Sequence, residues 1–150
     1  ETEIRRAWLP RGKPTVLKVD RTKIGQSYFG ALDQKTGRHH CIPVPWQTSE
    51  TIADALETII DAYPHKQVCI LWDNASWHRG KKLRERLGPG NTLARVRLVN
   101  LPPYAPDENP EEHVWKVGKE AIANTSFDTF DQLKERFVSV ITNRTFSYRI

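Results

Sequence analysis

The stretch VCILWDNASWH, residues 68–78, decides the fold that this sequence predicts. Its first five residues, Val68 to Trp72, are apolar and rich in β-branched and aromatic side chains, which is typical of a strand buried on both faces of a parallel sheet. The run stops abruptly at Asp73 and Asn74. Because ligands bind beyond the carboxyl ends of parallel strands in open α/β sheets, this position predicts a functional carboxylate at Asp73.

The segments on either side of this run predict a mixed sheet flanked by helices. Strands are expected at 15–19, 26–32, 40–44, 68–72 and 95–101, and helices at 49–63, 81–87, 110–124 and 129–142. A meander of short strands followed by alternating helices and strands is typical of an α/β domain.

The composition limits the class of protein. The chain has 150 residues, enough for one domain with a core that needs no disulfide or structural metal. It carries 23 Lys and Arg against 18 Asp and Glu, a net charge of +5, which favours a polyanion as partner. No apolar run approaches a membrane span and no signal sequence opens the chain, so an intracellular location is expected, in the cytoplasm or, in a bacterium, the nucleoid. Both cysteines, Cys41 and Cys69, are expected as buried thiols.

A second motif, LPPYAPDENPEEHVW at residues 101–115, supplies a partner for Asp73. Asn109 followed by Pro110 is a strong helix start, an N-cap residue before proline at the first helical position. Glu112 then falls in the first turn of this helix. Phosphodiester cleavage by two metal ions needs several carboxylates that converge on a pair of Mg²⁺ ions. If the strand end and the helix start adjoin, Asp73 and Glu112 can supply two of these carboxylates.

Each acid also has a purely structural interpretation. Asp73 and Asn74 can simply turn the chain. Glu112 stands three residues after Asn109, where a capping box places a glutamate that bonds back to the cap amide. It can also form an ion pair with Lys116, one helical turn later. The spacing alone leaves these alternatives open.

The two motifs resemble those of the mariner-like and insertion-sequence transposases, whose catalytic domains carry an Asp-Asp-Glu or Asp-Asp-Asp site. The patterns of that family read Asp-Asn-Ala-x-x-His and Leu-Pro-x-Tyr-x-Pro-x-x-Asn-Pro-x-Glu-x-x-Trp. The first falls on residues 73–78 of this chain and the second on residues 101–115. Looser similarity at 8–12 and 28–32 extends the resemblance over nearly the whole chain.

The resemblance implies a ribonuclease H-like fold, with a mixed five-stranded sheet flanked by helices, in one catalytic domain spanning residues 1–150. It also implies Mg²⁺- or Mn²⁺-dependent cleavage of DNA strands at transposon ends, with two ions in the complete site, and strand transfer to a target by the exposed 3′-hydroxyl. Asp73 would be the second acidic ligand and Glu112 the third. The first Asp is expected directly before Glu1, so the chain, which contains no methionine, is expected to be an N-terminally truncated fragment that binds DNA without cutting it.

Other residues are expected to support this activity. Asn74 and His78 follow Asp73 in the first motif, and His78 can orient a carboxylate, bind phosphate or form a local hydrogen bond. A basic segment around Trp8 is expected to project from the domain and to contact DNA or the partner in a homodimer of the full-length protein. The basic residues expected to bind DNA, at transposon ends and target, are Arg5, Arg6, Arg11, Lys13, Lys81, Lys82, Lys116 and Lys119.

Two alternative functions share these features. A noncatalytic ribonuclease H-like module for DNA binding or assembly would keep the fold and two acids after losing the third. A housekeeping nuclease of the same fold is a further alternative, although the Pro-rich second motif is more specific than the fold. An Asp immediately before Glu1 would favour the transposase, and another residue there would favour the module.

Overall fold

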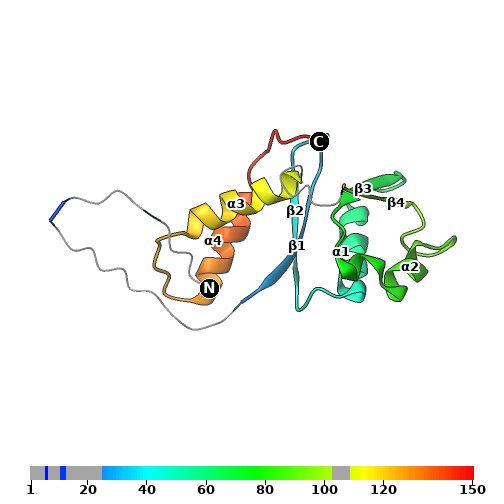
Figure 1. Ribbon diagram of the computed structural model, residues 1–150, viewed down its shortest axis with the longest axis horizontal. Coiled ribbons are helices and arrows are strands. Elements are labelled where there is room, and N and C mark those ends of the chain that lie inside the picture. Colours follow the sequence, from blue (N-terminus) through cyan, green and yellow to red (C-terminus); the bar gives the residue numbers. More distant parts are fainter. Residues whose placement is uncertain (1–5, 7–10, 13–24, 103–108) are drawn as a thin grey trace.

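The computed structural model describes residues 6, 11–12, 25–102 and 109–150. Its elements are, in chain order, β1 (Ser27–Leu32), β2 (His39–Val44), α1 (Ser49–Asp61), β3 (Val68–Trp72), the 3-10 helix η1 (Ser76–Arg79), α2 (Lys81–Leu87), β4 (Val96–Asn100), α3 (Pro110–Ile122) and α4 (Phe130–Thr142). In Figure 1 the β1–β2 hairpin stands between α3 and α4 on one side and α1, α2, β3 and β4 on the other. None of the helices in the described ranges is long and apolar enough to cross a membrane.

The strands form two separate ladders. β1 and β2 pair antiparallel, with Gly30 opposite Cys41, and β3 and β4 pair in parallel, with Trp72 opposite Asn100. A mixed α/β architecture is therefore confirmed. The described residues form two two-stranded sheets and not one five-stranded sheet, since β1 and β3 do not pair with each other. The strand expected at 15–19 lies outside the described residues.

Helix α1 forms because its sequence combines a capping box with an apolar stripe. The Thr51 amide donates to the Thr48 hydroxyl, and the Thr48 amide donates to the Thr51 hydroxyl. The buried residues of the helix are Ile52, Ala53, Ala55, Leu56, Ile59 and Ile60. Four buried residues of neighbouring elements complete this first hydrophobic core with α1, namely Trp72, Leu83, Leu93 and Val96.

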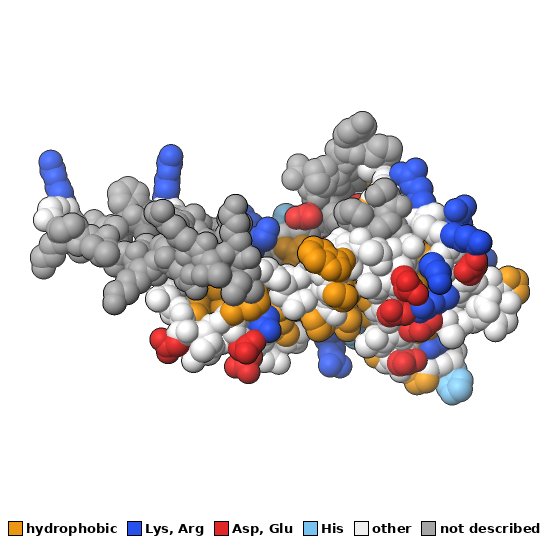
Figure 2. Space-filling view, turned by 90° about the horizontal axis from the view of Figure 1, so that it is seen from below, with side chains coloured by type: hydrophobic (Ala, Val, Ile, Leu, Met, Phe, Trp, Pro, Cys, Tyr) orange, Lys and Arg blue, Asp and Glu red, His pale blue; other side chains and the backbone are white. Residues whose placement is uncertain are grey.

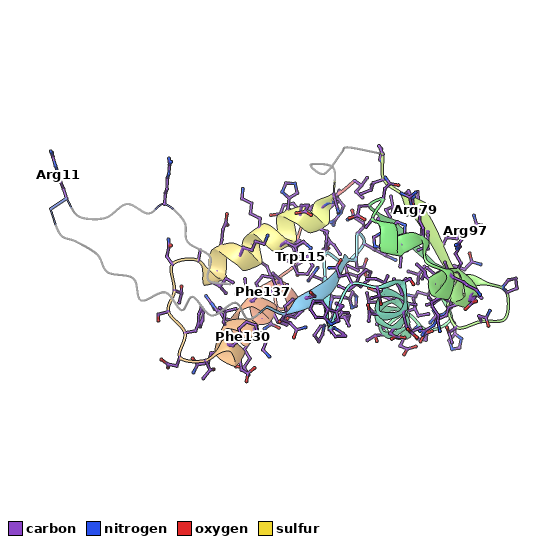
Figure 3. All side chains as sticks on the ribbon, turned by 60° about the horizontal axis from the view of Figure 1, so that its bottom comes forward. Arg11, Arg79, Arg97, Trp115, Phe130 and Phe137 are labelled. Atoms are coloured by element: carbon purple, nitrogen blue, oxygen red, sulfur yellow. The ribbon has the colours of Figure 1, made fainter. Side chains whose placement is uncertain are left out.

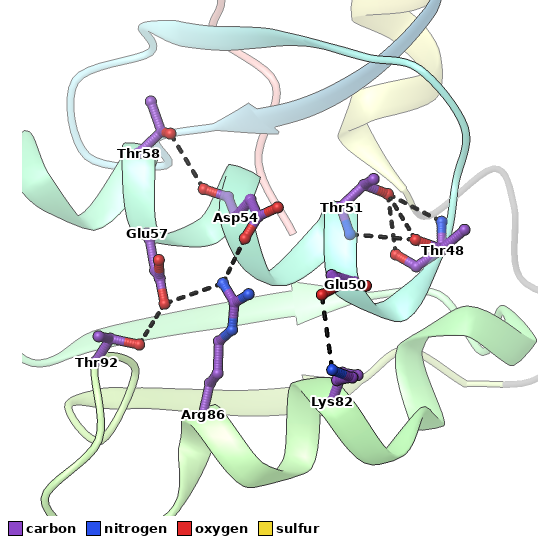
Figure 4. A network of polar contacts seen from close by, with 9 residues as sticks. All are labelled: Thr48, Glu50, Thr51, Asp54, Glu57, Thr58, Lys82, Arg86 and Thr92. Carbon is purple, nitrogen blue, oxygen red and sulfur yellow. Dashed lines mark hydrogen bonds and ion pairs between the residues drawn. The ribbon is translucent and has the colours of Figure 1, made fainter.

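Ion pairs join the exposed sides of α1 and α2 (Figure 4). Arg86 pairs with both Asp54 and Glu57, and Lys82 Nζ lies 3.8 Å from Glu50 Oε1. Exposed pairs of this kind contribute at most about 1 kcal/mol each. The fully buried side chain of Leu83 therefore holds α2 in place more than these charges do.

Arg95 satisfies the carbonyl groups at the end of α1. Its guanidinium donates hydrogen bonds to the carbonyl oxygens of Ile60, Tyr63 and Lys66. The last carbonyls of a helix have no partner within the helix, and α1 has no basic residue of its own in its last turn. The sequence predicted that the strand begins at Arg95, whereas β4 begins at Val96.

A second hydrophobic core lies between α3, α4 and the hairpin. Its buried residues are Val114, Ile122, Phe137, Ile141 and Phe146. The rings of Trp115 and Phe137 stack with centroids 5.9 Å apart, and Figure 3 shows both side chains between the helices. Gly118 allows this approach, because a Cβ atom there would lie 2.6 Å from the Phe137 ring.

The prediction that β3 is buried on both faces is wrong for the described residues. Leu71 is 42% exposed, and its partner in the parallel register, Val99, is 46% exposed. Cys69 is also exposed, and Cys41 is only partly buried, so neither cysteine is the fully buried thiol that the sequence predicted. The reason is that α1 and α2 cover one face of the β3–β4 ladder, through Ile70 and its neighbours, and no described element covers the other.

Asp33 anchors the turn between β1 and β2 and ties it to the end of α1. Its Oδ1 accepts hydrogen bonds from the amides of Lys35, at 2.8 Å, and Thr36, at 3.2 Å. Its Oδ2 accepts from the Tyr63 hydroxyl at 2.9 Å. Partial burial acts to raise the pKa of Asp33, but these hydrogen bonds outweigh it and lower the pKa to about 2.

The substitution Asp33→Asn is expected to remove a pH-dependent part of the stability. A carboxyl group whose pKa is depressed in the folded state contributes stability above its unfolded pKa, and loses that contribution as the pH falls through the folded value. The melting temperatures of the wild type and of Asp33→Asn, measured by circular dichroism, should differ by a few degrees near neutral pH. They should converge between about pH 4 and about pH 2. Parallel curves throughout this range would show that the turn carboxylate contributes nothing.

Candidate active site

A cavity of about 470 Å³ separates the two ladders. It touches every residue of β3 and the consecutive residues 28–32 of β1. Consecutive side chains of a strand point to opposite faces, so a cavity that touches all of them faces the edge of the strand. The opposite edges are paired, β1 with β2 and β3 with β4. The cavity therefore lies along two strand edges that pair with no other described strand, and its wall continues to Asp73 and Glu112.

Asp73 follows directly on the carboxyl end of β3, as the sequence predicts. Its Oδ1 accepts a hydrogen bond from the Ala75 amide at 2.9 Å, a local turn that fixes the side chain. His78 Nδ1 lies 3.1 Å from the same Oδ1 atom and 3.1 Å from the Asp73 carbonyl oxygen. The His78 ring stacks on Trp72, with centroids 4.0 Å apart and an interplanar angle of 4°. The Asp73 side chain remains 61% exposed, so it is oriented and still accessible.

Asn74 holds the ends of the parallel strands together. Its Nδ2 donates to the Leu101 carbonyl at 2.9 Å, and its Oδ1 accepts from Asn100 Nδ2 at 2.9 Å. Asn100 in turn accepts a hydrogen bond from the indole of Trp72. Asn74 is not among the residues that line the cavity, so its support for the site passes through the backbone that carries Asp73.

Glu112 lies in the first turn of α3, which Asn109 caps by accepting a hydrogen bond from the Glu111 amide at 3.1 Å. The Glu112 side chain is exposed at the cavity. Neither structural alternative is found among the described residues: Glu112 makes no side-chain bond to the Asn109 amide and no ion pair with Lys116. Glu112 is therefore available to a ligand in the cavity.

The adjacent carboxylate, Glu111, is engaged in a contact that sequence reasoning missed. Its Oε1 lies 2.6 Å from Nε2 of His39, at the start of β2, and the two residues are 72 positions apart in sequence. The His39 side chain is fully buried and that of Glu111 is 16% exposed. Burial, and then the negative charge of Glu111, raise the pKa of Cys41 to about 12. No local pattern predicts this pair, because the sequence around a histidine in a short strand does not indicate which helix packs against that strand.

The chemistry of these donors fits part of a divalent metal site. Asp73 and Glu112 offer carboxylate oxygens, the ligands that Mg²⁺ and Mn²⁺ prefer, at one cavity. No group of three or more His, Cys, Asp or Glu side chains among the described residues could hold a metal ion. The third acid that the resemblance implies is therefore not found beside Asp73 and Glu112 among the described residues.

The basic residues expected to bind DNA fall into separate groups. Lys81 and Lys82 pair with Glu85 and Glu50, at 3.7 and 3.8 Å, and basic and acidic side chains are interleaved at this end of the molecule in Figure 2. Lys116 and Lys119 are exposed on α3 and form no ion pair with any described residue. Arg6 and Arg11 are exposed, whereas Arg5, Lys13 and Trp8 lie outside the described residues, as does most of the segment expected to project.

Comparison with known proteins places the chain in a family. Residues 1–134 match the family described as DDE superfamily endonuclease, a match that includes both motifs. The chain is also similar to a protein of Sinorhizobium fredii (strain NBRC 101917 / NGR234) described as "Uncharacterized protein y4pE/y4sA", with 28% identity over 109 residues that cover 70% of this chain and 74% of that protein. With the family match covering most of its length, the chain belongs to the DDE superfamily endonucleases.

Proposed function

We propose that this domain catalyses metal-dependent cleavage of DNA strands at transposon ends and transfer of the exposed 3′-hydroxyl to target DNA. Membership in the endonuclease family supports a transposase-type nuclease that acts on DNA. The observation that carries the proposal further is that Asp73, at the carboxyl end of β3, and Glu112, in the first turn of α3, line the same cavity.

The residues of the chain have distinct parts in this proposal. Asp73 and Glu112 would hold the divalent ions, Mg²⁺ or Mn²⁺, and the contacts from His78 and the Ala75 amide keep Asp73 in one orientation. When bound, a pair of such ions supplies an activated nucleophile and stabilises the leaving oxygen. The third acid comes from outside the described residues, and the resemblance implies an Asp directly before Glu1.

The edges of β1 and β3 that pair with no described strand support a single sheet in this protein. Both edges face the cavity, and unpaired edge groups need partners when they are buried. We propose that a further strand lies between them, which would join the two ladders into the five-stranded ribonuclease H-like sheet that the resemblance implies. Homodimer formation in the full-length protein is also part of the proposal.

Cleavage of transposon-end duplexes by the full-length protein tests the proposed activity. Nicking or double-strand cleavage is expected in Mg²⁺ or Mn²⁺ and not in EDTA, with strand transfer to a target plasmid after cleavage. The 150-residue chain alone is expected to bind DNA and not to cut it, because its described residues supply two of the three acids that the resemblance implies. Robust cleavage by this chain alone would show that another of its residues completes the site.

The noncatalytic module remains the second candidate, because the described residues hold no set of three metal-binding side chains. It predicts DNA binding by the full-length protein with no cleavage in either metal. The two candidates therefore differ in one measurement, cleavage by the full-length protein in Mn²⁺, whereas DNA binding is common to both.

Lys116 and Lys119 are expected to bind the DNA that enters the site. They follow Glu112 by four and seven positions, so the three side chains form one stripe along α3 that starts at the cavity. Each phosphate contact steepens the salt dependence of log K by about 0.9. The double variant Lys116→Gln/Lys119→Gln should weaken binding and reduce the slope by roughly 2, measured by fluorescence anisotropy over a salt series.

The double variant Lys81→Gln/Lys82→Gln is the matched control, because it removes the same charge at the other end of the molecule, where both lysines already pair with acids. Its slope should change by less than about 1. Equal slopes for the two double variants would mean that DNA affinity depends only on the net charge of the protein. The stripe on α3 would then not be a binding surface.

A further inference from the structure

Two adjacent carboxylates in the first turn of α3 line the cavity but differ in their contacts. The Glu112 side chain is exposed there, whereas the Glu111 side chain is 16% exposed and meets His39 of the hairpin. Successive residues of a helix are separated by about 100° around its axis. An interaction that fixes the direction of Glu111 therefore also fixes the direction in which Glu112 points.

His39 contacts α3 at Glu111 and Trp115, which lie one turn apart. Its Nε2 atom lies 2.6 Å from Glu111 Oε1, and its ring packs edge-on against Trp115, with centroids 5.4 Å apart and an interplanar angle of 87°. The ring also makes an edge contact with Phe146, with centroids 6.5 Å apart. Contacts at positions i and i+4 of one helix restrain both its rotation and its translation along the axis.

Gly30 makes room for this arrangement. A Cβ atom at Gly30 would collide with Glu111 Oε1 and with the indole of Trp115, and would lie 2.8 Å from His39 Nε2. The backbone of β1 thus approaches the pair as closely as a residue without a side chain allows. β1, which carries Gly30, also lines the cavity, so the pair connects the cavity wall directly to the start of α3.

Burying the His39–Glu111 pair costs free energy, because polar atoms are removed from water. His39 Nδ1 and Glu111 Oε2 are both buried and have no hydrogen-bond partner among the described residues. A buried polar pair with unsatisfied atoms is often no more stable than apolar side chains of the same volume. Its contribution is better explained by the geometry that it imposes than by the stability that it adds.

We propose that His39 is a positioning residue for the metal site: by holding Glu111, it sets the rotation of the first turn of α3 and so the place of Glu112. The proposal rests on the proposed function, since it concerns the same site. Partners one step behind a metal ligand commonly alter metal affinity by about 10- to 100-fold when they are removed. His39 does not contact Glu112 and acts on it through Glu111 and the helix, so we expect an effect near the lower end of that range, about tenfold.

Mn²⁺ binding to the DNA-free, full-length protein tests this role without reference to activity. His39→Gln should raise the Kd for Mn²⁺, measured by electron paramagnetic resonance, by about tenfold. It should also raise the Mn²⁺ concentration for half-maximal cleavage by the same factor and leave DNA affinity in EDTA unchanged. Glu111→Gln keeps the histidine and should have a similar effect. The double variant should be no worse than either single variant, because all three lose the same contact.

His40→Gln is the matched control. His40 is the next residue of β2, and its Nε2 lies 2.8 Å from the Tyr63 hydroxyl, on the side of the hairpin away from α3. It should lower stability without changing the Kd for Mn²⁺ by more than about twofold. If His39→Gln and Glu111→Gln change Mn²⁺ affinity no more than His40→Gln does, the pair is only structural and the proposal is wrong. If Asp73→Asn and Glu112→Gln also leave Mn²⁺ affinity unchanged, the proposed function itself fails.

Discussion

Asp73→Asn in the full-length protein is expected to reduce Mg²⁺-dependent cleavage of transposon-end DNA by at least about a thousandfold, and Glu112→Gln should do the same. Each substitution removes one charged oxygen donor and keeps the shape of the side chain. Divalent-ion affinity depends on the number of charged oxygens, and a site with one acid fewer would hold its ions poorly. Asn at position 73 can still accept the hydrogen bond from the Ala75 amide, so the local turn should survive.

Single-turnover cleavage of a labelled duplex in Mg²⁺ and Mn²⁺, beside gel-shift binding in EDTA, measures this effect. Asp61→Asn and Glu135→Gln are the controls: both residues are exposed on helices, and neither takes part in an ion pair with a described residue. Control activities should stay within about twofold of wild type, and DNA binding should survive in all four variants, because phosphate contacts do not depend on the metal. Full activity in both site variants would remove the two-metal mechanism.

Leu56→Ala is expected to lower the free energy of unfolding by about 2–5 kcal/mol. Leu56 is fully buried at the centre of the first core, so the substitution loses the burial of its side chain and leaves a cavity. In a domain of this size the loss corresponds to a fall in melting temperature of roughly 5–15 °C. Urea denaturation followed by circular dichroism gives the free energy, and an unchanged slope would show that the unfolded state is unaffected.

Leu71→Ala removes the same atoms from β3 and serves as the comparison. Leu71 is 42% exposed on the open face of the β3–β4 ladder, so its truncation should cost less than about 1 kcal/mol. A cost for Leu56→Ala below that of Leu71→Ala would contradict the position of the first core. A large cost for both would instead show that the open face of the ladder is covered in solution.

The sequence predicted the elements well where local interactions decide them. The strand at residues 68–72 and the helix at residues 81–87 have the predicted bounds. Asn109 caps α3 as the sequence predicted, because a cap depends on side-chain to backbone bonds within one turn. The two motifs also pointed to the family, which the match over residues 1–134 confirms. The roles of Asp73 and Glu112 stay a prediction.

The tertiary structure alone decided which groups meet across the chain. Arg95 closes the end of α1, and His39 meets Glu111, 72 positions away. The exposure of Leu71 also contradicts the prediction, made from the apolar run at 68–72, that this strand is buried on both faces. Composition and periodicity record how a segment interacts with its own backbone and how much surface it can bury. They do not show which distant element packs against the segment. This packing determines the surroundings of each acid in the site.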